Sequence, residues 1–533
     1  MGVPARVAAS AGEEDLKLVS TAQMRAIEEE AESKGIASSQ LMQNAGRGIA
    51  EIIHAMGQEN GWDEVTSLIG PGNNGGDALV ALAWLAETGW RTHAYLVKPR
   101  ENDRLMQRYL DLGGEVEESW SSQSDGVLQN LLDMSDVLLD GVLGTGIKLP
   151  LKSEIGAVLL ETKRIIAGLE LPPYVVAVDC PSGVDCDTGA AAPETVPADL
   201  TLTMAAVKIG LIKLPAFEHL GKLQLVDIGL PGELSSFDEV RAEVADDEMI
   251  APLLPKRPLD SHKGTFGTAL IAAGSVSYTG AALLAGSAAY RIGAGLVIMA
   301  VPEPLHTAIA GHLPEAIWIL LPHISGCISE SAAQLLLQNT DRATACLIGP
   351  GLGQSAPTSQ FIESVITSAT IPMVVDADGL RHLSKIQDWH KRLFGQSILT
   401  PHPGEMSALT GLTREAIQSD RSEIARKYAR EWGHVVVLKG AFTVVASPEG
   451  GTIIIPVANA ALARAGTGDI LAGLIVGLRA QGLGAYDAAV AGAYVHAQAG
   501  LIAAGSLGTT ASVLASDVLR SVAIAVAELE RRE

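Results

Sequence analysis

The sequence predicts two α/β domains, each built on a largely parallel β-sheet with helices on both faces. Short apolar runs of strand length alternate with helical stretches along most of the 533 residues. Glycine-bearing loops follow several of these runs, as they do where a parallel strand leads into a helix. The alternation stops in the acidic, proline-dotted stretch 229–258 and then restarts. We expect a flexible, polar lead at 1–19, a first domain at 20–232, a linker at 233–250 and a second domain at 251–533.

The first domain is expected to open with a helix and then to alternate strands with helices. Ser20 and Thr21 form a capping signal, which predicts one helix from Ser20 to Gln43. One further helix is expected at Ala78–Glu87. The strands expected in this domain are Val65–Ile69, His93–Val97, Val137–Leu139, Val175–Val178, Leu200–Thr203 and Leu223–Val226.

The second domain repeats the alternation and ends in helices. Its expected strands are Thr268–Ala272, Leu296–Val301, Ile317–Leu321, Ala345–Ile348, Met373–Asp376, Ile398–Leu399, Val435–Leu438 and Thr443–Ala446. Three helices are expected after them, at Asp469–Arg479, Ala485–Ala503 and Val513–Glu530.

Composition and charge argue against several classes of function. The 61 acidic residues outnumber the 38 basic ones, for a formal net charge of −23, which argues against a nucleic-acid or anionic-membrane surface. No apolar stretch reads as a membrane span or a secretory signal, so a cytoplasmic protein is expected. Alanine-rich helices favour a homo-oligomer. The four cysteines, expected to be reduced and mostly buried because their spacing fits no zinc or redox motif, are Cys180, Cys186, Cys327 and Cys346.

A glycine-rich loop runs from Gly70 to Asp77, between an expected strand and a helix. It contains G-x-G-x-x-G, but a dinucleotide-binding site also needs an acid at the end of the next strand, where this chain has Leu96-Val97-Lys98. A hydride-transfer domain is therefore disfavoured. Two interpretations stay open: a tight strand-to-helix turn, or a loop whose backbone amides and helix N-terminus receive a phosphate.

Two further loops in the first domain carry acids directly after strands, at Asp140 and Asp179. The carboxyl ends of parallel strands meet at one edge of a sheet, so Asp77, Asp140 and Asp179 should gather there. Such oxygen donors suit a hard cation, and a carboxylate beside a reactive carbon can move a proton.

The strongest motif of the second domain is Ala465-Gly-Thr-Gly-Asp469 at the start of a helix. Backbone amides of Gly466 to Gly468 can stabilise charge on a transferred phosphoryl group, and Asp469 can deprotonate an attacking hydroxyl. The chain has no G-x-x-x-x-G-K-[ST] run, so it is not a P-loop enzyme. Each signal also has a plainer interpretation: a helix cap for the glycines, a rigid turn for His402 and a solvated charge for Lys439.

The first domain closely resembles the NAD(P)H-hydrate epimerase domain over about residues 20–230, through GPGNNGGD, DGVLGTG and AVDCPSGVDCDTG. Gly141 departs from the family, where a larger residue is more common. The resemblance implies a Rossmann-like three-layer fold, exchange of the R and S epimers of the hydrated nicotinamide, and a potassium ion held by Asn74, Asp140 and Ser182. It assigns acid/base work to Asp179. The substrate-lining residues that it implies, besides Asp179, are Asn73, Asn74, Gly75, Gly76, Asp77, Gly144, Thr145, Gly146, Ile147, Lys148, Leu149 and Pro150.

The second domain resembles the NAD(P)H-hydrate dehydratase domain of the ribokinase-like superfamily over about residues 250–530. The motifs, in order, are HKGTFG, GAALLAGSAAYRIGAGLV, GPGLG, DADGL, LTPHPGEM, KGAFTVV and AGTGDILAG. The resemblance implies ADP-driven removal of water from the S hydrate, with release of AMP and phosphate and with magnesium. Contacts to the hydrate are implied for Ala281, Gly353, His402 and Asp469. Contacts to the nucleotide are implied for Lys439, Gly440, Ala441, Phe442, Thr443 and Gly468.

Other functions remain to be weighed against this one. A small-molecule kinase of the hydroxyethylthiazole-kinase type shares the GTGD signature, and it would leave a stable phosphoester in place of free phosphate. The first domain could also be a binding module without catalysis, although its intact acids argue against that. Partners are therefore expected to be the NADH and NADPH hydrates and adenine nucleotides, without nucleic acid or membrane.

Overall fold

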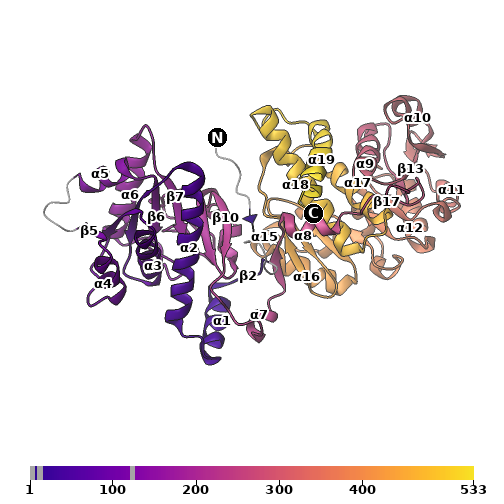
Figure 1. Ribbon diagram of the computed structural model, residues 1–533. Coiled ribbons are helices and arrows are strands. Elements are labelled where there is room, and N and C mark those ends of the chain that lie inside the picture. The colour runs from indigo at the N-terminus through magenta and orange to yellow at the C-terminus, as the bar shows by residue number, and fades with distance from the viewer. Residues whose placement is uncertain (1–6, 9–15, 120–125, 533) are drawn as a thin grey trace. The chain divides into compact units, whose positions relative to one another are not determined.

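The computed structural model describes residues 7–8, 16–119 and 126–532. The chain divides into two compact units, Met1–Val244 and Ala245–Glu533. Both are α/β units with largely parallel sheets, so the predicted fold class is confirmed (Figure 1). The division falls inside the stretch 233–250 that was expected to be a linker. That stretch is not without structure, since it holds α7 (Ser235–Asp238), β11 (Ala242–Val244) and α8 (Asp247–Ile250).

The first unit alternates strands and helices in the expected way. Its further strands are β1 (Val7–Ala8), β2 (Leu18–Val19), β3 (Glu64–Ile69), β4 (Arg91–Leu96), β5 (Glu115–Glu118), β6 (Val137–Gly141), β7 (Tyr174–Val178), β8 (Leu200–Met204), β9 (Val207–Lys208) and β10 (Lys222–Val226). Its further helices are α1 (Thr21–Ser33), α2 (Ser38–Asn60), α3 (Asn73–Glu87), α4 (Arg104–Asp111), α5 (Val127–Met134) and α6 (Ser153–Gly168).

The main sheet of the first unit is parallel throughout, in the order β1-β10-β8-β7-β6-β3-β4-β5. Alternate side chains of a strand enter different cores, because successive residues point to opposite faces. In β3, Val65 and Ile69 pack with α1 to α4, whereas Leu68 packs with α5 and α6. This is the three-layer arrangement expected for the domain, and it brings the carboxyl ends of β3, β6 and β7 to one edge.

The start of the first unit differs from the expectation in two places. The prediction of a single helix at Ser20–Gln43 is wrong, because helix α1 ends at Ser33 and Gly35 takes a positive φ of 96°. Ser20 does cap α1: its hydroxyl accepts from the Gln23 amide at 3.1 Å. The lead expected at 1–19 lies mostly outside the described residues. Its last part is ordered, since Leu16, Leu18 and Val19 are buried and β2 pairs with β9.

The second unit contains the following elements besides α8. Its strands are β12 (Thr268–Ala272), β13 (Leu296–Pro302), β14 (Ile317–Leu321), β15 (His323–Ile324), β16 (Cys327–Ile328), β17 (Ala345–Ile348), β18 (Met373–Val375), β19 (Ile398–Leu399), β20 (Val435–Leu438), β21 (Val444–Ala446) and β22 (Thr452–Ile454). Its helices are α9 (Thr279–Arg291), α10 (Glu303–Ile309), α11 (Ala332–Leu337), α12 (Ala356–Ser368), α13 (Asp378–Leu383), α14 (Pro403–Thr410), α15 (Arg414–Ser419), α16 (Arg421–Trp432), α17 (Thr467–Ala480), α18 (Ala485–Leu507) and α19 (Ala515–Glu530).

The sheet of the second unit runs in the order β22-β21-β20-β19-β18-β17-β12-β13-β14. It is parallel from β14 to β20, and β21 and β22 are antiparallel additions. Helices α9, α17, α18 and α19 bury small and branched side chains in one core with these strands. Among the described residues, α18 is the one helix long and apolar enough to cross a membrane, and most of it is buried in this core.

Both signature loops turn out to be first turns of helices. Helix α3 begins at Asn73, so Asn-Asn-Gly-Gly-Asp is helical, and α17 begins at Thr467, two residues before Asp469. Asp140 was expected just after a strand, but it lies within β6. Neither helix has a side-chain cap on its first amides, because glycines occupy the cap positions. The Thr467 amide donates to the Arg464 carbonyl at 3.4 Å, which leaves the Gly468 amide as the one to face a ligand at the start of α17.

Candidate active sites

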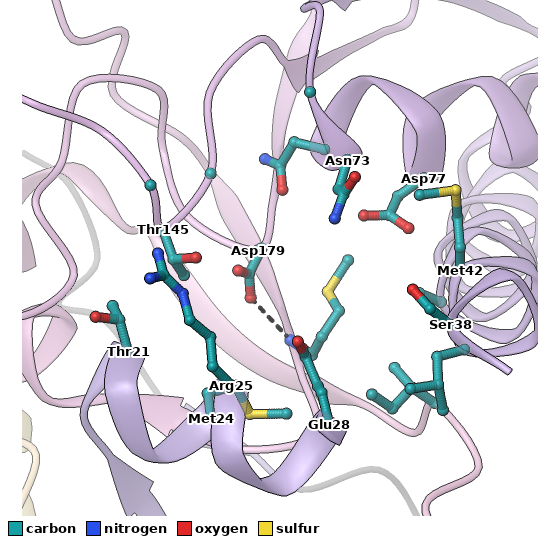
Figure 2. A pocket seen from close by; sticks show the side chains of 18 of the residues that line it. Thr21, Met24, Arg25, Glu28, Ser38, Met42, Asn73, Asp77, Thr145 and Asp179 are labelled. Atoms are coloured by element: carbon teal, nitrogen blue, oxygen red, sulfur yellow. Dashed lines mark hydrogen bonds between the residues drawn. The ribbon is translucent and has the colours of Figure 1, made fainter. Parts of the chain in front are cut away.

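The first unit contains a cavity of about 570 Å³ at the carboxyl ends of β3, β6 and β7. Helices α1 and α2 supply the facing wall (Figure 2). Eight of the residues that the sequence assigned to the substrate line this cavity: Asn73, Asn74, Asp77, Gly144, Thr145, Gly146, Ile147 and Asp179. The glycine loop, the Asp140 loop and the Asp179 loop therefore meet around one space.

The remaining assigned residues of this domain do not line the cavity. Gly75 and Gly76 are packed against neighbouring parts of the domain, where a side chain has no room. A Cβ at Gly75 would be 2.1 Å from the Gly70 carbonyl oxygen. Lys148 and Pro150 are exposed and Leu149 is half-buried, all outside the cavity lining. Their assignment to the substrate stays a prediction.

Asp179 is held in an unusual backbone conformation by buried partners. Its φ is +64°, a region that residues other than glycine rarely occupy and that recurs at functional sites. Its Oδ1 accepts from the Met204 amide at 3.1 Å, from the Thr203 hydroxyl at 3.2 Å and from the Lys208 ammonium group. Lys208 is 1% exposed and also donates to the Met204 carbonyl at 2.9 Å. The carboxylate is thus fixed in place against a buried cation.

Two more carboxyl groups face the same space as Asp179. Glu28 reaches in from α1, and Asp77 from α3, just after its first turn (Figure 2). Burial raises the pKa of Asp77 well above its usual value, and the nearby charges of Asp179 and Glu28 raise it further. Burial also raises the pKa of Glu28, with Lys208 opposing the shift. Three acids and one lysine therefore surround the place where a substrate would lie.

Of the three residues assigned to a cation, Asn74 lines the cavity, and Asp140 and Ser182 are buried next to it. Asp140 is 1% exposed, and it accepts from the Ser182 hydroxyl at 2.5 Å and from the Ser182 amide at 2.8 Å. Burial raises the pKa of the Asp140 carboxyl, although the Ser182 bonds oppose this. The Asn74 amide group donates to the Val178 carbonyl at 2.6 Å and to the Leu143 carbonyl at 3.0 Å. Its own oxygen is turned toward Gly144, where a Cβ would lie 2.7 Å away.

In the second unit, Asp469 lies in the first turn of α17, directly after Gly468. Burial raises its pKa to about 7, and the charge of Asp376 adds to the shift while Lys439 opposes it. A carboxyl group with such a pKa is suited to exchange protons near neutral pH. Asp469 therefore has both the place and the proton affinity expected of a catalytic base.

Lys439 lies at the end of β20, beside the same helix start. Its Nζ is 2.6 Å from Asp376 Oδ1 and 3.7 Å from Glu405 Oε2. A Cβ added at Gly468 would be 3.8 Å from Nζ, so the ammonium group lies close to the anion-binding turn. Asp376 also accepts from the Thr400 hydroxyl at 2.7 Å. The Lys439 ammonium group is thus held by the buried carboxylates of Asp376 and Glu405, and it lies close to Gly468.

His402 caps a helix as well as facing the site. Its Nδ1 accepts from the Gly404 amide at 2.9 Å, and the Glu405 carboxylate accepts from the His402 amide at 2.9 Å. Burial and the neighbouring Lys439 charge lower the pKa of His402 to about 4, so the ring is neutral at pH 7. The rigid-turn interpretation of His402 is therefore confirmed, and its contact with the hydrate stays a prediction.

The other assigned residues of the second unit lie in the loop after Lys439, in the loop that ends at Gly353 and on α9. In the loop after Lys439, Phe442 has a positive φ of 54° and the Thr443 hydroxyl donates to the Gly440 carbonyl at 2.9 Å. The Gly353 amide donates to Asp378 at 2.8 Å, and Asp378 is close enough to raise the pKa of Asp469. Ala281 is buried on α9, against the glycine loop that ends in Gly353, and Ala441 is exposed.

Several site residues were missed by sequence reasoning. Lys208 and Glu28 belong to no glycine motif, and Glu28 stands in an acidic run that is typical of an exposed helix surface. Asp376 and Glu405 do lie in quoted motifs, DADGL and LTPHPGEM, and their buried contacts with Lys439 could have been suspected from the ends of neighbouring strands. Among the described residues, no group of three or more His, Cys, Asp or Glu side chains could hold a metal. The described cysteines are free and mostly buried, as expected.

Comparison with known proteins decides the family. Residues 269–522 match the family described as NAD(P)H-hydrate dehydratase, and residues 38–210 match the family described as YjeF-related protein N-terminus. A bifunctional NAD(P)H-hydrate repair enzyme of Moorella thermoacetica is 36% identical over 527 residues, with 96% of this chain and 97% of that protein covered. The chain belongs to the bifunctional NAD(P)H-hydrate repair enzymes. A repair enzyme of Salinibacter ruber is also 36% identical, with 93% of each chain covered.

Both candidate sites of this repair enzyme lie inside the matched ranges, apart from the α1 side of the first cavity. Among solved structures, an ADP/ATP-dependent NAD(P)H-hydrate dehydratase from Bacillus subtilis, co-crystallised with ATP and Mg²⁺, is 34% identical. It aligns over 54% of this chain and 98% of its own, with a TM-score of 0.47.

Proposed function

We propose that the first unit interconverts the R and S epimers of NADH and NADPH hydrates, and that the second unit dehydrates the S epimer at the expense of ADP. One observation carries the proposal: a chain whose full length matches bifunctional repair enzymes keeps an acid at the reactive place of each site. Asp179 faces the first cavity, and Asp469 lies at the anion-binding turn of α17. Each site thus has a carboxyl group where the proposed chemistry needs one.

In the first unit, the loop amides at the start of α3 would hold the phosphates of the dinucleotide. The nicotinamide hydrate would then lie over Asp179, whose carboxylate can take a proton from the hydroxyl on the hydrated carbon. That carbon is bonded to both the hydroxyl oxygen and the ring nitrogen, so its configuration can invert once either bond opens. The 570 Å³ cavity has the size of a small-molecule site.

Potassium is the cation that we propose for Asn74, Asp140 and Ser182, because their chemistry suits it. The donor set is all oxygen, with one carboxylate from Asp140, the hydroxyl of Ser182 and the amide oxygen of Asn74, and such hard donors suit an alkali cation. A bound cation would offset the buried charge of Asp140. Asn74 bonds the Val178 and Leu143 carbonyls and Ser182 bonds Asp140, so these residues tie the three cavity loops together.

In the second unit, Lys439 to Thr443 and the Gly468 amide would hold the phosphates of ADP. Ala281, Gly353, His402 and Asp469 would contact the hydrate. Asp469 takes the hydroxyl proton, and the oxygen then attacks the β-phosphorus so that AMP leaves. The ring-nitrogen electrons expel the new phosphate, and loss of a proton from the adjacent carbon restores the dihydronicotinamide. Magnesium would neutralise phosphate charge during this transfer.

The experiment is a product analysis of the full chain. With S hydrate and ADP, we expect dihydronicotinamide absorbance to recover and free phosphate and AMP to appear in equal amounts. With R hydrate and no nucleotide, we expect S hydrate to form faster than in buffer. A stable phosphoester in place of free phosphate would instead identify a small-molecule kinase and contradict the proposal.

We further propose that the protein acts in the cytoplasm, as a homo-oligomer. The predominance of acidic residues and the burial of α18 support a cytoplasmic location. Exposed apolar side chains on and between the two terminal helices, such as Leu507, Leu514 and Ile524, support self-association. Sedimentation equilibrium of the purified chain gives the mass of the assembly, and a monomer at micromolar concentration would contradict the second point.

A further inference from the structure

The epimerase cavity holds more proton-carrying groups than one acid/base residue requires. Asp77, Glu28 and Asp179 approach it from α3, α1 and the end of β7 (Figure 2). Opening a ring at a carbon that bears a hydroxyl needs two groups: one that takes the hydroxyl proton and one that gives a proton to the ring nitrogen. The surroundings of the three acids indicate which of them does which.

Asp179 is built as the base. Its Oδ1 accepts from Lys208, Thr203 and Met204, and Lys208 is itself buried. A buried ammonium group and two further donors on one oxygen hold the carboxylate in a fixed position. Of the described residues, none has a hydrogen bond to Oδ2, so that oxygen is available to a hydroxyl proton.

Asp77 has the opposite surroundings. It lines the cavity but has no bonded cation among the described residues, and it faces the negative charges of Asp179 and Glu28. Burial and these two charges raise its pKa well above the usual value, while Lys208 opposes them only in part. A carboxyl group in this setting keeps its proton to higher pH and can donate it.

Glu28 is a weaker candidate for the donor. It also has a raised pKa, but two cations, Lys208 and Arg25, act against the shift. Its helix, α1, lies outside the range that matches the YjeF-related family, whereas Asp77 lies inside it. The charged groups that face Asp77 from the surrounding elements are thus Glu28 from α1, Asp179 from the end of β7 and Lys208 from β9, with Arg25 beside Glu28.

Resting on the epimerase activity proposed above, we propose that Asp77 is a second catalytic residue, the proton donor to the ring nitrogen, and that Lys208 positions Asp179 as the base. Asp179 takes the hydroxyl proton, and the O–H electrons form a carbonyl. The bond from carbon to nitrogen breaks, its electron pair goes to nitrogen, and nitrogen takes the proton of Asp77. Rotation of the carbonyl carbon about its remaining carbon–carbon bond then presents its other face to the nitrogen. The reverse steps close the ring on that face. Protons and electrons balance without water or any oxidant.

The test measures R-to-S exchange by the full chain with R hydrate of NADH and no nucleotide. Asp77→Asn should lower kcat by about 100-fold or more, the usual contribution of a positioned proton donor, and leave KM within a few fold. The wild-type kcat should fall as pH rises through the pKa of Asp77, and Asp77→Asn should lack this fall. Glu87→Gln, at the exposed far end of the same helix, is the matched control and should behave as wild type.

The possible failures are distinguishable. If the wild-type chain exchanges the epimers no faster than buffer, the epimerase function itself is wrong, and this inference falls with it. If the wild type is active but Asp77→Asn keeps its kcat and its alkaline fall, only this inference is overturned. A large loss in Glu28→Gln with normal Asp77→Asn also overturns it. If Asp77→Asn binds hydrate poorly, Asp77→Glu is the deciding variant. Proton donation is supported if Asp77→Glu recovers part of kcat and also the fall of kcat at high pH. The inference is overturned if it recovers neither.

Discussion

Lys439 Nζ lies 2.6 Å from Asp376 Oδ1, where the carboxyl ends of two strands of the second sheet come together. The lysine side chain is 16% exposed and the aspartate 2% exposed, so the pair is largely shielded from water. Lys439 also lies next to Gly468, so in the proposed nucleotide site a phosphate would meet a cation that is already fixed in place. If that proposal is right, the same lysine contributes both to nucleotide binding and to the stability of the domain.

Replacing Lys439 with methionine should therefore weaken both properties. ADP loses its cation, and Asp376 is left as a buried charge without its partner, which typically costs about 3 kcal/mol or more. We expect ADP binding to be lost in calorimetry and the melting temperature of the domain to fall. Lys391→Met, which removes an exposed lysine paired to Asp388, should change neither. Unaltered ADP affinity in Lys439→Met would remove this residue from the nucleotide site.

Asp469 links activity to pH. Because its pKa is about 7 in the folded protein, the base form appears as pH rises through that value, and dehydration of S hydrate should rise with it. Asp469→Asn should lower the rate by about 100-fold or more and abolish the rise. Unaltered dihydronicotinamide recovery from S hydrate and ADP would show that another group is the base.

The same raised pKa predicts an effect on stability. Asp469 ionises near pH 4 in the unfolded chain but near pH 7 when folded, so the folded state holds the extra proton between these values. Stability from this group is therefore lost as pH rises from about 4 to 7. Asp469→Asn should melt at a higher temperature than wild type at pH 8. The two should differ less at pH 5, where the wild-type carboxyl is mostly protonated.

The sequence predicted the sheets and the glycine turns because these depend on local pattern. Val65–Ile69 reads as a strand from its own residues, and Asn73 to Asp77 reads as a turn from its glycines. The break at Gly35 was missed because a lone glycine inside a helical pattern is a weak signal. Lys208 and Glu28 were missed for another reason. Their roles come from contacts with Asp179 and Asp77, residues far away in the chain, and such pairings are set by tertiary structure alone.

Lys208 should be essential to the first site and unimportant to the second. In Lys208→Met the ammonium group that holds Asp179 is absent, so we expect R-to-S exchange to fall by about 100-fold, as for loss of an acid/base group. Dehydration of S hydrate with ADP should stay at the wild-type rate. Lys222→Met, an exposed lysine on β10, is the matched control. Exchange should be measured well below the melting temperature, because loss of a buried pair also destabilises the domain.

Gly144 provides a test of the proposed potassium site that leaves every oxygen ligand in place. A Cβ at this position would lie 2.7 Å from the Asn74 amide oxygen, and Gly144 has an ordinary backbone conformation, so alanine adds only this collision. Since the Asn74 nitrogen is tied to two carbonyl groups, the amide cannot turn away without breaking those bonds. Gly144→Ala should therefore displace the Asn74 oxygen that we propose as a ligand of the cation.

We expect R-to-S exchange by the wild type to rise with potassium and to saturate, and Gly144→Ala to need several times more potassium for half of its maximum rate. Gly168→Ala, where a Cβ meets no atom within 4 Å, should match the wild type. Sodium or choline at equal ionic strength separates binding of the ion from screening by salt. If exchange is equally fast in choline, or if Gly144→Ala responds to potassium as the wild type does, the cation does not lie at Asn74.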